Sequence, residues 1–213
     1  AIPFENWSTV YQDMNQPLTD YWIASSNKTF LTGDQLKGKS SVSMYMKILH
    51  KGCRSVSMDC WDGSPTYILD RSSEELSQED LPKSYTNPEP VITQGRTLIK
   101  KISFREVVEC IKNSAFTFNP YPVIISLQVY CSEEQQNVMA EILQNTFKNE
   151  IFTLKELKEN YGGKWPSPNE LKKRIIIKAR VGDERTWGND TGSVSNGVEA
   201  TDSKNIISPA ITS

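Results

Sequence analysis

The sequence lacks several features that would narrow its function at once. It contains a single histidine, His50, so a catalytic mechanism that needs two imidazoles finds too few of them in this chain. It has no run of about eighteen apolar residues, the length that a membrane-spanning helix requires. Residues 1–7 lack the basic and apolar regions of a signal peptide. We therefore expect a cytoplasmic protein that is at most peripheral to a membrane.

Neither the charge nor the cysteine content favours a nucleic-acid-binding or zinc-binding protein. The 24 Lys and Arg residues nearly balance the 26 Asp and Glu residues, so no basic field attracts nucleic acid and we expect no such partner. The cysteines show no C-x-x-C spacing and fall in or beside apolar stretches, which favours buried reduced thiols over disulfides or zinc ligands. They are Cys53, Cys60, Cys110 and Cys131.

Short apolar runs with the character of β-strands alternate with stretches of helical periodicity. This alternation implies a parallel sheet with right-handed crossovers. A closed eight-stranded barrel takes about 250 residues, so the predicted α/β fold is a parallel (β/α) barrel of which four βα units form one half of the TIM type. The predicted strands cover residues 21–24, 55–59, 122–128 and 174–178, with a short extended piece at 91–92.

Capping signals mark the helix starts. Ser103 and Ser132 each stand three positions before a Glu or Gln, and Ser167 stands three positions before Glu170, so a helix is predicted to begin near each of the three serines. Another helix, capped by Ser40 or Ser41, is predicted to place Val42, Tyr45, Met46 and Leu49 on one apolar face. His50 lies in its last turn, facing away from the strand ends, and is read as a favourable helix-dipole contact or plain surface.

The chain is predicted to hold one folded unit with polar flanks. We expect a lead-in over residues 1–20, the half barrel over 21–180 and a flexible linker-like tail over 181–213. Residues 64–90 are rich in Ser, Glu and Pro without periodicity, which predicts a solvated excursion. Since half a barrel leaves its sheet edges open, we expect a second barrel half, from the same protein downstream or from another chain.

The strand at 55–59 is where the sequence places the site. Asp59 stands at its carboxyl end, beside Trp61, and the Asp62-Gly63 dipeptide is typical of a turn. A carboxylate at the carboxyl end of a strand that precedes a helical pattern is where α/β folds carry chemistry. Asp59 is therefore a candidate functional residue, whereas Asp62 is read as a turn former.

Several short sequence motifs appear in an order that resembles the X region of eukaryotic phosphoinositide-specific phospholipase C, over residues 14–180. The resemblance implies the first half of a catalytic barrel that hydrolyses phosphatidylinositol bisphosphate at the inner membrane face, with calcium bound in the barrel mouth. The motifs are Asn15-Gln-Pro-Leu18, Gly33-Asp-Gln-Leu36, Gly52-Cys-Arg54, Asp59-Cys-Trp-Asp-Gly63, Pro120-Tyr-Pro-Val-Ile124 and Pro166-Ser-Pro168.

The resemblance also implies where the two catalytic imidazoles would stand, and this chain has neither. The family's Ser-Ser-His-Asn-Thr pattern, in which His stabilises the phosphorane and Asn binds calcium, reads Ser25-Ser-Asn27-Lys28-Thr29 here. The second histidine, in a Tyr-His-Gly pattern, is replaced by Gln94 in Thr93-Gln94-Gly95. Asn27 and Gln94 are therefore substituted catalytic positions, and Lys28 stands at a former metal-ligand position.

The remaining calcium ligands implied by the resemblance are largely changed too. The family's Glu-x-Asp pair, whose glutamate also assists deprotonation, reads Ser57-Met-Asp59, so Asp59 is the remnant of the metal site. Gln128 replaces the glutamate of a Ser-Leu-Glu pattern. Lys28 opposite Asp59 predicts an internal ion pair that repels a divalent cation, and we expect no bound cofactor.

The phosphate-binding pattern of the family is retained in charge. Its Lys-x-Lys, which grips the inositol ring phosphates, reads Lys178-Ala-Arg180. Basic residues also commonly end a strand beside solvent, and the sequence leaves both interpretations open. The leading hypothesis is a catalytically defective X-domain-like module of phosphoinositide signalling that binds headgroups weakly, or protein partners, and reaches the inner membrane surface through other domains.

Two alternatives belong to other classes. The first is an active phosphatidylinositol bisphosphate phosphodiesterase with a site rebuilt from Asp59, Lys28, Arg96 and groups of the missing half. A charged lysine is a poor base at neutral pH unless burial lowers its pKa markedly. The second alternative is a structural assembly module whose open sheet edges pair with another chain.

Overall fold

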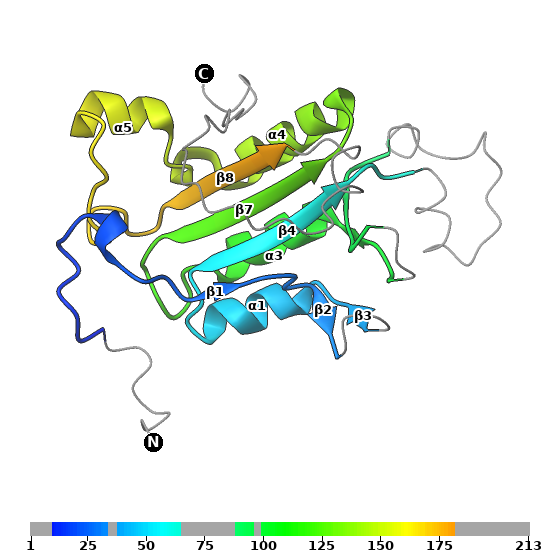
Figure 1. Cartoon of the computed structure of the whole chain (residues 1–213), viewed down its shortest axis with the longest axis horizontal. Coiled ribbons are helices and arrows are strands. Elements are labelled where there is room, and N and C mark those ends of the chain that lie inside the picture. Colours follow the sequence, from blue (N-terminus) through cyan, green and yellow to red (C-terminus); the bar gives the residue numbers. More distant parts are fainter. Residues whose placement is uncertain (1–9, 34–37, 65–87, 96–98, 182–213) are drawn as a thin grey trace, which may run out of the picture.

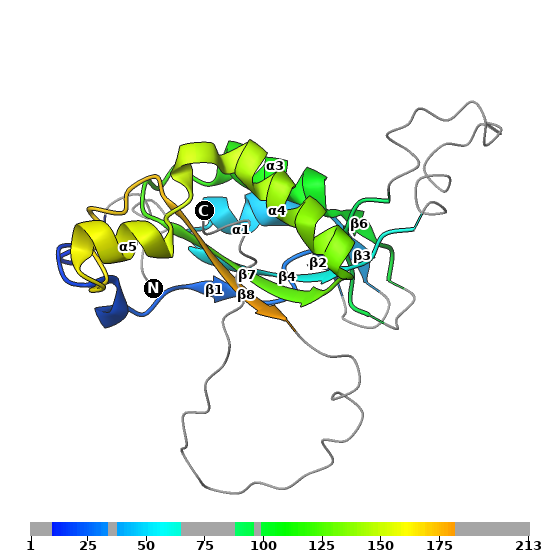
Figure 2. The same cartoon turned by 90° about the horizontal axis from the view of Figure 1, so that it is seen from above.

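The computed structural model describes residues 10–33, 38–64, 88–95 and 99–181. The greater part of the predicted polar excursion, all but one residue of the tail, and Arg96 lie outside these residues. The first nine residues of the lead-in also lie outside them. The remainder forms a layer of helices against one face of a curved sheet (Figures 1 and 2).

The centre of the sheet is parallel, as predicted. Strand β4 (Ser55–Trp61) pairs in parallel with β7 (Val123–Tyr130), and β7 pairs in parallel with β8 (Ile175–Val181), as the aligned arrows in Figure 1 show. The short β1 (Ser25–Ser26) pairs in parallel with the first residues of β4. This arrangement confirms the fold class of a half barrel of parallel strands.

The edge beyond the end of β4 differs from the expectation of a parallel sheet. Strands β5 (Val91–Ile92) and β6 (Ile102–Ser103) are antiparallel additions, β5 pairing with Cys60 and Trp61 of β4. A separate antiparallel pair is formed by β2 (Leu31–Thr32) and β3 (Lys39–Ser40). The extended piece predicted at 91–92 corresponds to β5, but antiparallel pairing needs no helical crossover, so the helix–strand alternation did not indicate how these short strands pair.

Helices α1 (Ser43–His50), α3 (Phe104–Ser114) and α4 (Glu133–Phe147) cover one face of the sheet (Figure 2). The short α5 (Leu154–Tyr161) lies beside the amino end of β8, and single turns of 3-10 helix occur at Leu18–Asp20 and Lys148–Glu150. The face under the helices is the hydrophobic core. Among the described residues, helices α1, α3 and α4 all lie on that one face of the sheet.

Strict alternation of buried and partly buried residues along β4 and β7 separates the two faces of the sheet. Val56, Met58 and Cys60 of β4 are fully buried, as are Val123 and Ile125 of β7. Burying each large apolar side chain contributes about 1.5–3 kcal/mol relative to exposure. The residues between them are only partly buried, and they point to the concave face that a second barrel half would cover.

The first predicted strand was placed too early. Residues 21–24 do not form a strand, and Trp22 is fully exposed. The hydrogen-bonded ladder begins at Ala24, whose carbonyl accepts from the Arg54 and Ser55 amides at 2.9 and 3.1 Å. Tyr21 and Ile23 instead line an apolar groove described below. The apolar character of this stretch therefore reflects packing outside the ladder.

The capping predictions met different outcomes. The Ser103 hydroxyl accepts from the Glu106 amide at 3.3 Å and caps α3 as expected. At Ser132 the predicted helix start is confirmed, since α4 begins at Glu133, but the side-chain cap is absent and the Ser132 amide donates to Asp62 at 2.9 Å. The Gln135 side chain instead bonds to both backbone groups of Gly63, at 2.9 and 3.2 Å.

Other helix starts were also shifted or missed. Helix α1 has no side-chain cap and begins at Ser43, and Met46 is exposed although its spacing predicted an inward position. Ser167 and Glu170 form the hydrogen bonds of a capping box, but residues 169–173 make only turns. Helix α5 was not predicted, although the Thr153 hydroxyl accepts from the Glu156 amide at 3.1 Å.

The cysteines are reduced, as predicted. Cys60 and Cys131 are buried, whereas Cys53 and Cys110 are half-buried. Burial raises the pKa of Cys60 well above its usual range and that of Cys131 to about 12, so both stay thiols at neutral pH.

Candidate functional site

The candidate site lies on the concave face, at the carboxyl half of the parallel strands. Strand register aligns Ser57 of β4 with Ser126 of β7, and Ser126 with Lys178 of β8. One step further along, Asp59 aligns with Gln128, which aligns with Arg180. Paired residues share a face, so the predicted positions on three different strands form two adjacent rows. The Lys178 side chain is exposed, and Arg180 is placed by its backbone register alone.

Asn27 and Ser57 are joined directly. The Ser57 hydroxyl donates to Asn27 Oδ1 at 2.8 Å and accepts from the Lys28 amide at 3.0 Å. The Lys28 amide also donates to Asn27 Oδ1 at 3.0 Å. These bonds hold the turn after β1 against β4, and none of the three side chains is a carboxylate or an imidazole. At this position the site has an amide, a hydroxyl and an ammonium.

Lys28 adopts a left-handed backbone conformation with φ of +49°. A non-glycine residue in this region costs roughly 1–2 kcal/mol, and such residues concentrate at functional sites. The two bonds from its amide to Asn27 and Ser57 hold the conformation in place. The turn therefore fixes the direction in which the Lys28 side chain leaves the backbone.

Asp59 is coupled to Lys28. Burial raises the pKa of Asp59 above its usual value, and the positive charge of Lys28 lowers it in part. The carboxylate therefore sits in a partly desolvated position with a cation close enough to favour its ionised form. The direction of this charge effect agrees with the interaction between Lys28 and Asp59 that the sequence suggested.

We expect Asp59→Asn to raise the melting temperature at pH 7. A raised pKa means that the folded state binds the proton more tightly, so ionised Asp59 costs stability above its folded pKa. That cost disappears as the pH falls to the unfolded value of about 3.9, so the two proteins should converge there. Thermal melts at both pH values measure this, with exposed Asp20→Asn as the control. An Asp59→Asn protein that melts lower at pH 7 would show that the Lys28 contact outweighs desolvation.

Gln94 lies at this edge of the sheet, next to an aromatic stack that no sequence pattern predicted. Trp61 and Tyr130, aligned on β4 and β7, stack at 4.5 Å with an interplanar angle of 22°. A Cβ at Gly95 would overlap the Trp61 indole, so only glycine lets the chain pass there. The Thr93 amide also donates to the Asp59 carbonyl at 3.2 Å. Half-buried Gln94 therefore lies beside the end of β4. In the sequence, only the glycine of Thr93-Gln94-Gly95 could have indicated this close packing.

His50 is remote from this edge, as predicted. It ends α1, which leads into the amino end of β4, whereas the candidate site lies toward the carboxyl ends of the strands. Its ring packs edge-on against Phe118, with centroids 4.7 Å apart. The only imidazole of the chain therefore serves packing at the opposite end of the sheet.

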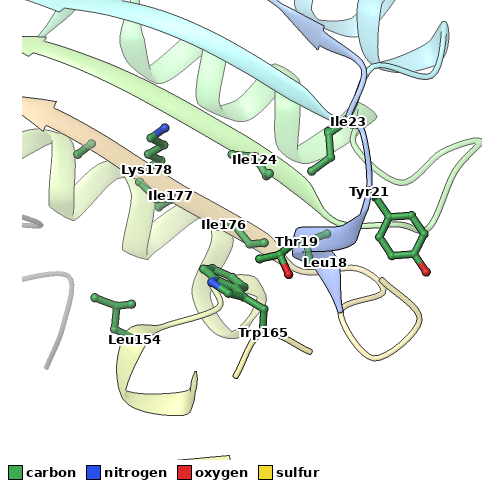
Figure 3. Close-up of a pocket in the computed structure, with 11 residues that line it drawn as sticks. Leu18, Thr19, Tyr21, Ile23, Ile124, Leu154, Trp165, Ile176, Ile177 and Lys178 are labelled. Carbon is green, nitrogen blue, oxygen red and sulfur yellow. The ribbon is translucent and has the colours of Figure 1, made fainter. Parts of the chain in front are cut away.

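An apolar groove of about 410 Å³ lies on the same concave face, nearer the amino ends of β7 and β8 (Figure 3). Ile124 and Ile176 form its floor in register, and Trp165 and Leu18 stand at its sides. Lys178 borders it toward the polar rows. No sequence pattern indicated this groove, because it joins segments from both ends of the chain.

Within the described residues, no group of three or more His, Cys, Asp or Glu side chains gathers where it could hold a metal ion. No described helix is long and apolar enough to cross a membrane. The concave face thus combines half a barrel, two polar rows and one carboxylate beside a lysine. These features define the chain as a TIM-type half barrel with a polar site at the carboxyl ends of its strands.

Residues 14–181 match the family model of the phosphatidylinositol-specific phospholipase C X domain, and the chain belongs to this family. It is 42% identical over 176 residues to mouse 1-phosphatidylinositol 4,5-bisphosphate phosphodiesterase zeta-1, a match that covers 83% of this chain and 24% of the mouse protein. The crystal structure of S. officinalis PLC21 superposes with a TM-score of 0.61 at 35% identity, covering 78% of this chain and 19% of that one.

A calcium-dependent phosphoinositol-specific phospholipase C from a Pseudomonas species shares the fold alone. Its TM-score is 0.53 at 12% identity, covering 79% of this chain and 59% of the bacterial one. The chain spans about a quarter of the mouse relative and a fifth of the S. officinalis protein. In this family the X domain pairs with a Y domain, the second barrel half that the sequence led us to expect.

Proposed function

We propose that this chain is an X domain that binds phosphoinositide headgroups without hydrolysing them. The observation that carries the proposal is the Asn27–Ser57 hydrogen bond at the end of the first strand pair. Hydrolysis needs a base for the inositol 2-hydroxyl and an acid for the leaving glycerol oxygen. An amide and a hydroxyl bonded to each other supply neither at neutral pH. Gln94 is an amide as well, and His50 lies at the opposite end of the sheet.

The residues present do not fit the calcium ion of the family. Calcium takes six to eight oxygen ligands, commonly from several carboxylates. On the two polar rows Asp59 is the one described carboxylate, and the positive charge of Lys28 lowers its pKa. Gln128 offers a neutral amide at the neighbouring strand position. No step of the proposed function therefore passes through a metal ion.

Binding rests on the basic end of β8. Lys178 is exposed beside the groove, and the backbone register places Arg180 two residues further along the same strand. An ammonium and a guanidinium form charge-assisted hydrogen bonds with phosphate oxygens. Because the Y half would complete the headgroup pocket, the affinity of this half alone should be weak. Residence at the inner membrane face would then depend on other domains.

We expect inositol 1,4,5-trisphosphate to bind the intact protein with a Kd between about 40 µM and about 6 mM, since two charge-assisted contacts of roughly 1.5–3 kcal/mol each support no more. The double variant Lys178→Ala, Arg180→Ala should weaken binding about tenfold or more. Lys172→Ala is the matched control, because Lys172 lies over Tyr121 and outside the proposed pocket. Calorimetric titration at two salt concentrations measures this. Equal affinity in wild type and double variant would remove the headgroup role.

A second candidate, assembly without ligand binding, is favoured by the groove beside the outer edge of β8. Among the described residues, that edge pairs only where Ile151 bridges Ile175. An open apolar edge of this kind favours pairing with a second barrel half. Size-exclusion chromatography of residues 1–213 tests the idea, because a compact, soluble monomer would contradict obligatory pairing. The rebuilt-enzyme alternative involves Arg96, which lies outside the described residues.

A further inference from the structure

Lys28 occupies a built position on the concave face. Its backbone is held at φ +49° by two hydrogen bonds from its amide, to Asn27 Oδ1 and to Ser57 Oγ, each 3.0 Å long. The residue is half-buried, and its charge acts on Asp59, two positions along β4 from Ser57 on the same face. A strained backbone held by its neighbours fixes the direction in which the side chain leaves the backbone.

The position of Lys28 also relates it to the basic end of β8. Ser57, which binds the Lys28 amide, aligns across β7 with Lys178. Neighbouring strands lie about 4.8 Å apart, so the backbone positions of Ser57 and Lys178 are separated by about 10 Å. The backbones of Lys28 and Lys178 therefore lie at opposite ends of one row of the concave face. This spacing suits a ligand with two anionic groups on a small rigid ring.

We propose that the Lys28 ammonium is a built-in cation that binds a phosphate group on the concave face in place of a metal ion. An ammonium group carries three donors, enough to bind more than one phosphate oxygen at once. The negative charge of Asp59 opposes the incoming anion. The inference rests on the proposed function and adds its regulation, namely that phosphate binding is independent of calcium.

The proposal makes Asp59 and Lys28 act in opposite directions. Removing the lysine charge takes away an attraction for phosphate, whereas removing the carboxylate charge takes away a repulsion. If Asp59 were instead a calcium ligand, its loss would weaken any phosphate binding that runs through the metal. The sign of the Asp59→Asn effect therefore separates an internal ammonium from a metal site.

The test is calorimetric titration of the intact protein with inositol 1,4,5-trisphosphate, in millimolar calcium and in chelator. We expect equal affinity in the two buffers, about tenfold weaker binding in Lys28→Asn, and about threefold or more tighter binding in Asp59→Asn. Asn tolerates the left-handed conformation, so Lys28→Asn should keep the fold. Lys28→Arg retains the charge and should retain binding, and Lys172→Asn is the control for charge alone. Thermal melts confirm that each variant is folded.

Three results would overturn the inference while leaving headgroup binding intact: tighter binding in calcium, loss of binding in Asp59→Asn, or unchanged binding in Lys28→Asn. Absence of binding in every buffer would instead remove the proposed function itself, and this inference with it. Repeating the titration with vesicles that contain phosphatidylinositol bisphosphate distinguishes a lipid headgroup from a free inositol phosphate as the source of the anion. The same order of variants in either arm supports the Lys28 site.

Discussion

Hydrolysis of phosphatidylinositol bisphosphate by the intact protein is expected to be slower by at least about 10⁴-fold than hydrolysis by an active relative such as the mouse phosphodiesterase. General acid–base catalysis contributes about 10²–10⁴-fold, and under the proposed correspondence Asn27 and Gln94 place an amide at both imidazole positions of the family pattern. The same proposal implies loss of the cation that stabilises the phosphorane, which lowers the rate further. A radiolabelled-lipid assay in calcium measures the ratio, and turnover within tenfold of the relative would contradict it.

Restoring the family residues provides the matched experiment. Restoring the two imidazoles alone, with Asn27→His and Gln94→His, should give less than about a tenfold gain, because the metal position still carries Lys28. Restoring the acids and the metal position as well should raise turnover about a hundredfold or more. A large gain from the imidazole pair alone would show that the chain already holds a working electrophile. The complete set of substitutions is Asn27→His, Lys28→Asn, Ser57→Glu, Gln94→His and Gln128→Glu.

Arg54→Met is expected to destabilise the fold by about 3–5 kcal/mol. The Arg54 guanidinium donates to the carbonyl of Ala115 at 2.7 Å, of Leu49 at 2.9 Å and of Cys53 at 2.8 Å. It thereby joins the end of α1, the end of α3 and the start of β4. Burial lowers its pKa to about 10, so it remains charged at neutral pH. Methionine fills the space but removes all three donated bonds, although the Leu49 carbonyl keeps a backbone donor, the Gly52 amide at 3.0 Å.

Urea denaturation measures the Arg54 effect, with Arg105→Met as its control. Arg105 pairs with Glu89 at 2.6 Å, but the two side chains are 44% and 37% exposed, so its loss should cost less than about 1 kcal/mol. Arg54→Lys keeps the charge without the planar fork and should lie between the two. Equal losses for Arg54→Met and Arg105→Met would mean that the carbonyl contacts of Arg54 contribute little.

The sequence predicted the central architecture because the residue pattern of each central strand indicates that the strand is buried. Helical stretches between apolar runs indicate parallel crossovers, and three of the four predicted parallel strands correspond to β4, β7 and β8, each extended by two or three residues. The Ser103 cap was predictable for the same reason, since its partner lies three residues away. Local spacing suffices when both partners of an interaction lie within one element.

The failures involve partners far apart in the chain. Gln135 was expected to cap its own helix but binds Gly63, 72 residues away, because a buried backbone amide and carbonyl there need partners. The apolar character of residues 21–24 predicts a strand, yet Tyr21 and Ile23 line a groove with Trp165. Apolar character alone does not distinguish a ladder from a groove wall.

By itself the sequence determined which chemical groups the candidate site can contain: one carboxylate on β4, amides at positions 27, 94 and 128, and basic residues at 178 and 180. No folding of the chain creates a second imidazole. The tertiary structure decided how these groups act on one another. It placed Lys28 close enough to Asp59 to change its pKa and locked the Lys28 backbone through Ser57, 29 residues away. Charge interactions and hydrogen bonds depend on distances of a few ångströms, and strand register, which pairs residues far apart in the chain, sets those distances.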